Sequence, residues 1–559
     1  MNNYYKSSFQ LLVIAVLAVT AGWHMGSWNT SAPVPLTTAA YPVMDKSIGF
    51  YIGSDMTEDG SVILGGFGHE PSSHWIDIVP AQTHPDGSTL QVGVTMDSRI
   101  GGELTHIPQV RRTNKYISST YSEYAGFPPP LTNGGLNEHG LAARDIWSPS
   151  RRELVAMTEV PQRGPNYSDL ARIAMERAGS AREAVEIIGK LIDEYGYSSY
   201  GGNSHLFADK EEGWVFINYA GGHRLWAAER LGPDDIRVSY PGYINAFPAD
   251  RENNDDFMSS DNLVGFAIEH GWWDPETDDA DSLDLQAVFG EPFPGQGINK
   301  EENYYAAARM PHKREAELKK MAPVGLEDML AHVRDPRWSN DLSGYGQVAH
   351  LRAGIDDELQ TLWLAVTGAV TTPFVPIPIA TQKVPPEFLQ HRYLTKNSDS
   401  RFLAFDYAMQ EASRYAVREF KRLMYYTCEN PQLFLHPVTA AIEDFESTML
   451  IERDQLEAEA SGLLQAGNRA GAQALLTDNV GKRLLESLDL AMSLTRIVEE
   501  ETRNQFGFRL PAGNNVRGET IPPASQSMAM EEVSEMISCY DPDLDHYPRA
   551  HGIYSLDGK

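Results

Sequence analysis

Short hydrophobic segments alternate with turn residues along the first part of the chain. Between residues 49 and 255, runs rich in aromatic and β-branched residues are separated by turn signals such as the acidic, glycine-ended turn at 58–60. Two stretches instead repeat their apolar positions every three or four residues, which predicts helices over 168–179 and 180–196. Ser168 and Ser180 are the predicted N-caps. The pattern therefore indicates a mixed α and β domain.

The pattern changes towards the C-terminus. Strand character returns at 361–366 and 374–379, and after about residue 402 the apolar positions follow a helical period. We expect two long helices that form a hairpin packed on the preceding domain. The predicted buried stripes are Ile442, Phe445, Met449 and Leu456 on one helix, and Leu484, Leu488, Ala491 and Ile497 on the other.

An apolar run at 11–21 follows Lys6 near the start of the chain. Its length is typical of a signal-peptide core and too short for an ordinary membrane span. A polar, proline-rich spacer follows at 29–38. Near its end, Thr38 and Ala40 are small residues with the spacing of a signal-peptidase cleavage site. We interpret this region as a cleaved signal peptide, which predicts a periplasmic or secreted protein. An uncleaved membrane anchor is the alternative, because only one lysine flanks the run.

Composition limits the possible partners. The chain of 559 residues has 77 Asp and Glu against 46 Lys and Arg, a formal net charge of -31. Such a surface repels phosphate backbones, so nucleic acid is not an expected partner. The two cysteines, Cys428 and Cys539, are too few for a disulfide-rich scaffold or a four-thiolate metal site. They could pair or remain free, and nothing in the sequence indicates an oligomeric state.

The segment 47–70 predicts a β-hairpin whose first residue is Ser47. A serine in this position is an ordinary strand residue unless the preceding peptide bond is cut. After such a cut, the new α-amino group has an unperturbed pKa of about 7.7–8.0. It can then act as general base for the adjacent Oγ, so that nucleophile and base belong to one residue.

This hairpin resembles the start of the PepD-type dipeptidases, a branch of the N-terminal-nucleophile hydrolases, with Ser47 where the family has cysteine. The glycine Gly53 and the Asp59-Gly60-Ser61 turn are in register with that family. Further matching segments follow in family order: His84-Pro85-Asp86-Gly87, Ile107-Pro108-Gln109-Val110, Asn137-Glu138-His139-Gly140-Leu141, residues 180–197, Phe207-Ala208-Asp209, Trp214-Val215, Thr361-Leu362-Trp363 and Leu475-Leu476-Thr477-Asp478.

The resemblance implies an α+β fold, arranged as an αββα sandwich. It also implies an enzyme that cleaves short peptides with a free N-terminus and needs no cofactor. It places the hydrolase-like domain at 41–400, after the signal peptide or anchor at 1–40. A helical extension at 401–511 and a partly irregular tail at 512–559 complete the predicted organisation.

The resemblance also implies roles for individual residues. Ser47 is the candidate nucleophile, and Asn137 or Tyr240 is a candidate oxyanion donor. His69 stands beside the position where the family has an aspartate that orients the catalytic amine. Tyr240 occupies the place of a family asparagine, and Tyr243 that of a common arginine. These departures surround the expected site.

Two other motifs have some features of binding sites. The segment His69-Glu70-Pro71-Ser72-Ser73-His74 has one residue too many for a zinc-protease motif, and its proline disfavours a helix. The glycines at 65–68 lack the lysine of a phosphate-binding loop and indicate a turn or bulge. Accordingly, no metal is expected.

The leading hypothesis is an exported peptidase that hydrolyses short peptides, dipeptides first of all, through an N-terminal Ser47. Two alternatives remain. The chain could be a catalytically impaired homologue that binds or supports other molecules, as the altered residues around Ser47 suggest. It could also hydrolyse another amide, since fold alone does not determine the substrate.

Overall fold

The computed structural model describes most of the chain between Ser47 and Gly507. The described residues are 47–69, 74–121, 126–199, 201–239, 242–250, 254–290, 312, 314–336, 338–341, 343–391, 414–507, 513–514, 520–521 and 539. The apolar run at 11–21 lies outside them. Among the helices of these residues, none has the length and apolar character needed to cross a membrane.

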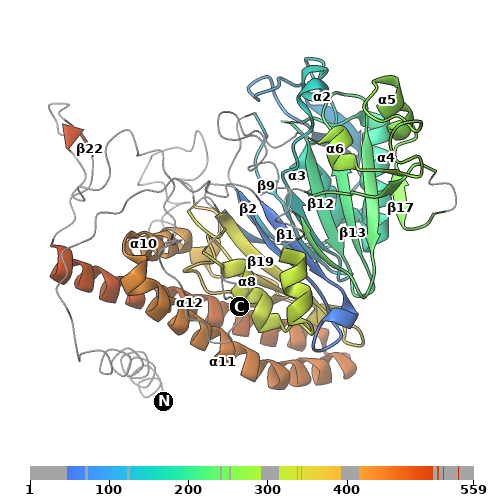
Figure 1. The fold of residues 1–559 in the computed structure, drawn as a ribbon. Helices are drawn as coiled ribbons and strands as arrows, with labels where there is room; N and C mark the ends of the chain where they lie inside the picture. Colours follow the sequence, from blue (N-terminus) through green and yellow to red (C-terminus); the bar gives the residue numbers. More distant parts are fainter. Residues whose placement is uncertain are drawn as a thin grey trace.

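Two antiparallel β-sheets form the centre of the fold (Figure 1). The six-stranded sheet has the order β15 (Ile236–Ser239), β1 (Ile48–Ile52), β2 (Val62–His69), β19 (Ser343–Leu351), β20 (Thr361–Ala365) and β21 (Val375–Pro378). Strands β1 and β2 pair as the hairpin predicted from the sequence. The glycines at 65–68 lie within β2 rather than in a turn, but the pairing with β19 is irregular opposite Gly68, where the register shifts between Ser343 and Gly346.

The second sheet has nine strands. Along its main path the order is β17 (Phe257–Ser259), β14 (Trp226–Leu231), β13 (Gly213–Asn218), β12 (Asn203–Ala208), β11 (Ala142–Ile146), β10 (Gly134–Asn137), β8 (Tyr116–Tyr121) and β3 (His74–Val79), and β9 (Leu131–Thr132) pairs with β8. Four short ladders lie outside the two sheets: β4 (Gln82–Thr83) with β7 (Arg112–Thr113), β5 (Thr89–Val92) with β6 (Thr105–Pro108), β16 (Phe247–Pro248) with β18 (Ser282–Leu283), and β22 (Gly513–Asn514) with β23 (Thr520–Ile521).

The two sheets pack face to face through the side chains of their inner faces. A Cβ atom on Gly49 of β1 would lie only 2.7 Å from Leu206 and 2.9 Å from Ile146, both on the nine-stranded sheet. Two residues further along β1, the Tyr51 hydroxyl donates a hydrogen bond to the Leu231 carbonyl oxygen. Buried aliphatic side chains from both sheets form one continuous core. We call the space between these inner faces the inter-sheet layer.

Helices α3 (Tyr167–Arg177) and α4 (Ala181–Tyr195) cover the outer face of the nine-stranded sheet (Figure 1). Helix α4 has the predicted cap at Ser180 and ends at Gly196. The predicted cap of α3 at Ser168 was wrong, because Asn166 and Asp169 form a reciprocal capping box two residues earlier. The Ser168 hydroxyl instead accepts a hydrogen bond from the Thr132 backbone N–H.

A second helical layer covers the outer face of the six-stranded sheet (Figure 1). It comprises α8 (Leu326–Arg334), α10 (Ala416–Glu429), α11 (Pro431–Gln465) and α12 (Arg469–Phe506). The layer order is therefore helix, sheet, sheet, helix, which confirms the predicted αββα sandwich.

On α11, Ile442, Phe445 and Met449 are buried as predicted, and Leu456 is half-buried. On α12, Leu484, Leu488 and Ala491 are buried, but Ile497 is 38% exposed. Steps of three and four residues carry the buried stripe on to Leu494 and Val498 instead. Ile497 is therefore one position out of phase and faces away from the core.

Three short helices gather beyond one end of the nine-stranded sheet: α2 (Arg152–Ala156), α5 (Leu263–Glu269) and α6 (Leu285–Phe289), at the top of Figure 1. Three single 3-10 turns complete the described elements: η1 (Ser54–Met56), η2 (Asp357–Leu359) and η3 (Pro386–Phe388).

A buried ion pair joins the helical hairpin to α8. The Arg334 guanidinium lies 2.5 Å from the Glu446 carboxylate, and the two side chains are only 5% and 4% exposed. The same carboxylate accepts a hydrogen bond from the Phe374 backbone N–H at 2.6 Å. Burial raises the pKa of Glu446, while Arg334 opposes that rise. The pair fixes α11 against the sheet because neither charge can be left alone in the interior.

We expect Glu446→Gln to lower the free energy of unfolding by about 3–5 kcal/mol, because it leaves the Arg334 charge uncompensated. The matched control is Glu499→Gln, which breaks the Arg422–Glu499 pair at 2.8 Å between side chains that are 49% and 36% exposed. That change should cost at most about 1 kcal/mol. Urea denaturation of both variants measures the difference, and equal losses would contradict the role of the buried pair.

Candidate active site

Ser47 stands immediately before strand β1 and faces the inter-sheet layer. Successive side chains of a strand point to opposite faces, so Ser47 shares the face of Gly49 and Tyr51. Both of those residues contact the nine-stranded sheet. Ser47 is only 4% exposed. The candidate nucleophile is therefore directed between the sheets rather than towards solvent or the helices.

Two glycines, Gly49 and Gly66, lie next to Ser47 on the inner face of the six-stranded sheet. Gly49 pairs with Gly66 of β2 across the hairpin. Gly66 has a φ of +144°, and a Cβ atom there would lie 2.1 Å from the Ile48 carbonyl oxygen, so no other residue fits without moving the backbone. These two glycines leave the inner face of the six-stranded sheet without side chains next to Ser47.

A buried arginine enters the inter-sheet layer from the opposite sheet. Arg144 of β11 is 0% exposed and lies on the same face of its strand as Ile146, which contacts Gly49. Its guanidinium carbon lies 4.7 Å from the centre of the Tyr345 ring on β19. An aromatic ring stabilises a cation over its face, most strongly where water is absent.

Tyr345 lies in β19, on the other side of β2 from the strand that Ser47 precedes. Gly346 and Ile48 both pair with Phe67. Just before Gly346 the register of β19 shifts, between Ser343 and Gly346, so that Tyr345 lies at an irregularity of the strand.

Asp145, the next residue of β11, belongs to the other face of the strand. Its carboxylate accepts hydrogen bonds from the Asn133 and Asn203 side-chain amides, the latter at 3.5 Å. The distance from Asp145 Oδ1 to the Arg144 guanidinium is 3.9 Å. The carboxylate is thus held mainly by amides and contacts Arg144 only at the limit of an ion pair.

His205 lies beside this network under helix α3. It pairs with Asp145 across β11 and β12, and its Nε2 lies 3.2 Å from the Tyr167 carbonyl oxygen. Its ring stacks on Phe207 with centroids 5.6 Å apart. Burial lowers the pKa of His205 to about 4. The ring is therefore neutral near pH 7 and donates a proton to the carbonyl.

Serine hydroxyls line the end of the inter-sheet layer. Ser148 Oγ and Ser204 Oγ share a hydrogen bond of 2.7 Å, and the Ile146 carbonyl oxygen lies within hydrogen-bond distance of both, so one of the two hydroxyls donates to it. Ser148 also accepts from the Gly242 backbone N–H at 2.9 Å. This chain of hydrogen bonds attaches the loop after β15 to the nine-stranded sheet near the start of β1.

The other predicted site residues are placed differently. Asn137 ends β10 at the far end of β11, and its amide donates to the Met175 and Ala178 carbonyl oxygens while its oxygen accepts from two hairpin N–H groups. It holds the hairpin against α3 and is not brought to Ser47. His69 ends β2 and pairs with Ser343. Tyr240 lies outside the described residues.

Tyr243, which stands where the family often has arginine, has a structural partner. Its hydroxyl hydrogen bonds to the Glu315 carboxylate, and Arg237 lies 5.0 Å from the centre of its ring. Arg237 also pairs with Glu229 at 2.9 Å. Burial, together with these carboxylates, raises the pKa of Tyr243, so the phenol is neutral and already donates its proton.

Sequence reasoning missed Arg144 and its ring partner. The signal was present, because Arg144 and Asp145 interrupt an apolar segment that reads Leu-Ala-Ala-Arg-Asp-Ile. Two adjacent charged residues within an apolar, buried strand must form ion pairs, hydrogen bonds or ring contacts elsewhere in the fold, because a buried charge is costly without them. Only the pairing of the sheets shows which partners these are.

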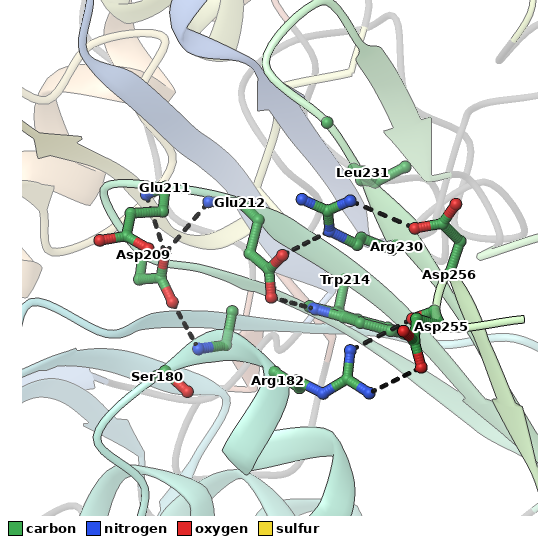
Figure 2. Close-up of polar contacts among 12 residues, drawn as sticks. Ser180, Arg182, Asp209, Glu211, Glu212, Trp214, Arg230, Leu231, Asp255 and Asp256 are labelled. Carbon is green, nitrogen blue, oxygen red and sulfur yellow. Dashed lines mark hydrogen bonds and ion pairs between the residues drawn. The ribbon is translucent and has the colours of Figure 1, made fainter.

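Charged groups also gather at the opposite end of the nine-stranded sheet (Figure 2). Figure 2 shows Arg230 between Glu212 and Asp256, and Arg182 beside Asp255 near the Trp214 ring. The turn between β12 and β13 belongs to this cluster, whereas the opposite ends of these strands lie near Ser47. We interpret it as a structural network that joins the start of α4 to the sheet.

Two hollows in the described structure also lie away from Ser47. One is lined by residues of β19–β21 and the helical hairpin, including Trp363 and Arg483. The other is a polar groove that includes Lys115, Glu138 and Glu358. Burial lowers the pKa of Lys115 to about 8. Within the described part of the chain, no group of three His, Cys, Asp or Glu residues is arranged to hold a metal ion.

Comparison with known proteins agrees with the sequence motifs. The sequence model of Peptidase family C69 matches residues 131–313. "Probable dipeptidase B" of Lactococcus lactis subsp. lactis is 36% identical over 130 residues, which cover 23% of this chain and 26% of that protein. "Probable dipeptidase" of Salmonella dublin is 29% identical over 137 residues, 24% of this chain and 30% of that protein.

These matches confirm the resemblance to the dipeptidase family for the central part of the chain. They span less than a third of the length of either relative. Among solved structures, a mutant conjugated bile acid hydrolase of Clostridium perfringens aligns with 60% of this chain and 93% of its own, at 11% identity and a TM-score of 0.28.

The buried His205 predicts a pH-dependent stability. Its folded pKa of about 4 lies below the ordinary value of 6.5, so only the unfolded chain binds a proton between these pH values. Stability from this group is therefore complete above pH 6.5 and falls as the pH drops towards 4. The loss should approach about 3 kcal/mol.

Urea denaturation at pH 7.5 and 4.5 measures this loss. His205→Gln keeps a donor for Tyr167 but cannot titrate, so its stability should fall less between the two pH values than that of the unmodified protein. Replacement of the exposed His436 by Gln is the control and should leave the fall unchanged. The interpretation is wrong if His205→Gln and the unmodified protein lose stability equally.

Proposed function

We propose that this protein is an exported hydrolase of short peptides whose nucleophile is Ser47 at the N-terminus of the processed chain. The observation that carries the proposal is the place of Ser47, at the start of a central strand and directed into the inter-sheet layer. The match of residues 131–313 to Peptidase family C69 supports the same class of reaction.

The chemistry follows from cleavage of the bond between Lys46 and Ser47. The freed α-amine takes the Oγ proton as Oγ attacks the scissile carbonyl carbon. The amine then returns this proton to the leaving nitrogen, the carbon–nitrogen bond breaks, and an ester on Ser47 remains. Water repeats the sequence on the ester and releases the acid. No cofactor enters these steps.

Oxyanion stabilisation in this proposal falls to groups near the start of β1. Asn137 does not support that role, because both of its amide protons are donated to backbone carbonyls. Tyr240 remains a proposed donor, since it directly follows Ser239, the residue that pairs with Gly49. His69 remains a proposed neighbour of the amine at the end of β2, which pairs with β1.

Intact mass and a dipeptide panel test the proposal. The mature protein should begin at Ser47, and its kcat/KM should rise with pH as the α-amine loses its proton, around pH 7.7–8.0. Ser47→Ala should lower kcat/KM at least about a thousandfold. Ser47→Cys is the matched control, because a thiol is a competent nucleophile in the same place.

A chain that begins at Tyr41 or Met1 would rule out the amine as base. Equal activity of Ser47→Ala and the unmodified protein would show that Ser47 is not the nucleophile. Inactivity on every dipeptide, with retained binding, would favour the impaired homologue. Hydrolysis of acylated amino acids in place of dipeptides would favour the other amide hydrolase.

The export proposal is supported by a disulfide. Cys428 on α10 is bonded to Cys539, 111 residues further along the chain. Such bonds persist in oxidising compartments and are rare in the cytosol. Together with the apolar run at 11–21, this pairing supports a periplasmic or secreted protein.

We expect the protein to lack reactive thiols until it is reduced, and reduction to lower the free energy of unfolding by about 2–4 kcal/mol. Alkylation of unreduced protein taken directly from host cells, followed by mass analysis, measures both the oxidation state and the N-terminus. Alkylated Cys428 and Cys539 in a chain that retains residues 1–40 would contradict export with signal removal. The Cys428→Ser, Cys539→Ser double variant serves as the thiol-free control.

A further inference from the structure

A polar groove of about 730 Å³ lies at the end of the sandwich opposite Ser47. Its walls come from both sheets, because Lys115 directly precedes β8 of the nine-stranded sheet and Glu358 lies in η2, between β19 and β20 of the six-stranded sheet. Tyr116, the residue after Lys115, pairs with Asn137, which is not brought to Ser47. The groove is therefore separate from the candidate active site.

Side chains of both charge signs line this groove. Besides Lys115, its charged residues are Glu138, Lys210, Asp356, Asp357, Glu358 and Arg469. Lys210 Nζ lies 3.5 Å from the Asp357 carboxylate, and Arg469 pairs with Glu358. Glu138 is paired with Arg112 at 3.2 Å. Within the described residues, Lys115 is thus the cation of this groove that has no carboxylate at ion-pair distance.

The Lys115 amine is held in place without being neutralised by a countercharge. Its Nζ donates a hydrogen bond of 2.7 Å to the Thr381 carbonyl oxygen. This bond joins the segment before β8 to the segment after β21, and so connects the two sheets at the groove. Because a carbonyl oxygen carries no full charge, it stabilises the ammonium form of the lysine less than a carboxylate would.

Partial burial of Lys115 favours the neutral amine. It lowers the pKa of Lys115 to about 8, while the carboxylates of Glu358 and Glu138 oppose that fall. The side chain is half-buried and lines the groove, so a small molecule can reach the amine. A neutral lysine amine is a nucleophile, and desolvation is one of the ways in which proteins activate it.

We propose that Lys115 is a site of covalent modification, whose amine accepts the acyl group of an activated ester that enters the groove. The nitrogen attacks the acyl carbon and forms the new bond. The bond from that carbon to the ester oxygen breaks, this oxygen leaves with the electron pair, and the proton lost by the nitrogen passes to water. The resulting amide keeps one N–H for the Thr381 carbonyl oxygen and removes the positive charge. This modification does not require Ser47.

Competitive acetylation of the purified protein tests the proposal. The protein is treated at pH 7 with less than one equivalent of p-nitrophenyl acetate, and peptide mass analysis measures the acetylation of each lysine. At this pH about one tenth of the Lys115 amine is neutral, against about one in 2,500 for a lysine with the ordinary pKa of about 10.4. Lower basicity removes part of this advantage, so Lys115 should react at least about tenfold faster than Nα-acetyl-lysine amide in the same mixture.

The pH dependence of the reaction gives a second readout. The rate at Lys115 should level off above about pH 8, whereas the rate of the reference amine should rise until about pH 10.4. A lysine that only joins the two sheets as an ammonium group would follow the reference amine. That result would overturn the proposal.

Lys210 is the matched control within the protein, because it lines the same groove but is paired with Asp357. In the folded protein Lys115 should be acetylated faster than Lys210, and the difference should disappear in denaturing urea, where both amines are exposed. Equal rates in the folded protein would overturn the proposal. So would a difference that persists in urea, because the local sequence and not the groove would then cause it.

Lys115→Arg keeps a donor for the Thr381 carbonyl oxygen but offers no nucleophilic amine. This variant should lose the rapidly formed acetyl-lysine, while acetylation of Lys210 stays unchanged. Rapid formation of acetyl-lysine in the variant would overturn the assignment to Lys115. If the variant does not fold, the rates measured on the unmodified protein still decide.

Discussion

Two β-sheets can pack face to face only where the side chains of their inner faces fill the space between them, and around Ser47 that space depends on glycine. At the other end of β1, Tyr51 fills the layer and reaches the Leu231 carbonyl oxygen. At the Ser47 end, Gly49 and Gly66 contribute no side chain, and a Cβ atom on either would meet atoms closer than 3 Å. The side chains of Leu206 and Ile146 from the nine-stranded sheet fill the place that a side chain on Gly49 would take, so the two sheets approach closely there.

The buried charges of this protein are stabilised in different ways. Arg334 and Glu446 neutralise each other across two structural elements. Arg144 lies over an aromatic ring, and the adjacent Asp145 is held by amides. His205 avoids charge altogether by remaining neutral. The ion pair fixes a helix onto the sheet, whereas Arg144 lies between the two sheets over the Tyr345 ring.

Local patterns predicted the elements of the fold well. The hairpin of β1 and β2, helix α4 with its Ser180 cap, and the long helical pair all follow from periodicity and capping residues. The errors came from competition between local signals. Asn166 and Asp169 form a stronger cap than Ser168, and the stripe on α12 drifted by one residue at Ile497 because a helical turn is not a whole number of residues.

The sequence by itself determined that Ser47 begins a strand, that glycines follow it at fixed spacing, and that the chain resembles the dipeptidases from this strand onwards. Strand order and sheet pairing decided the rest, because they bring together residues far apart in the chain. Only the tertiary structure placed Arg144 over the Tyr345 ring, left Asn137 at the far end of its strand, and paired Cys428 with Cys539. Contacts between distant residues depend on how whole faces pack, and no local pattern records that.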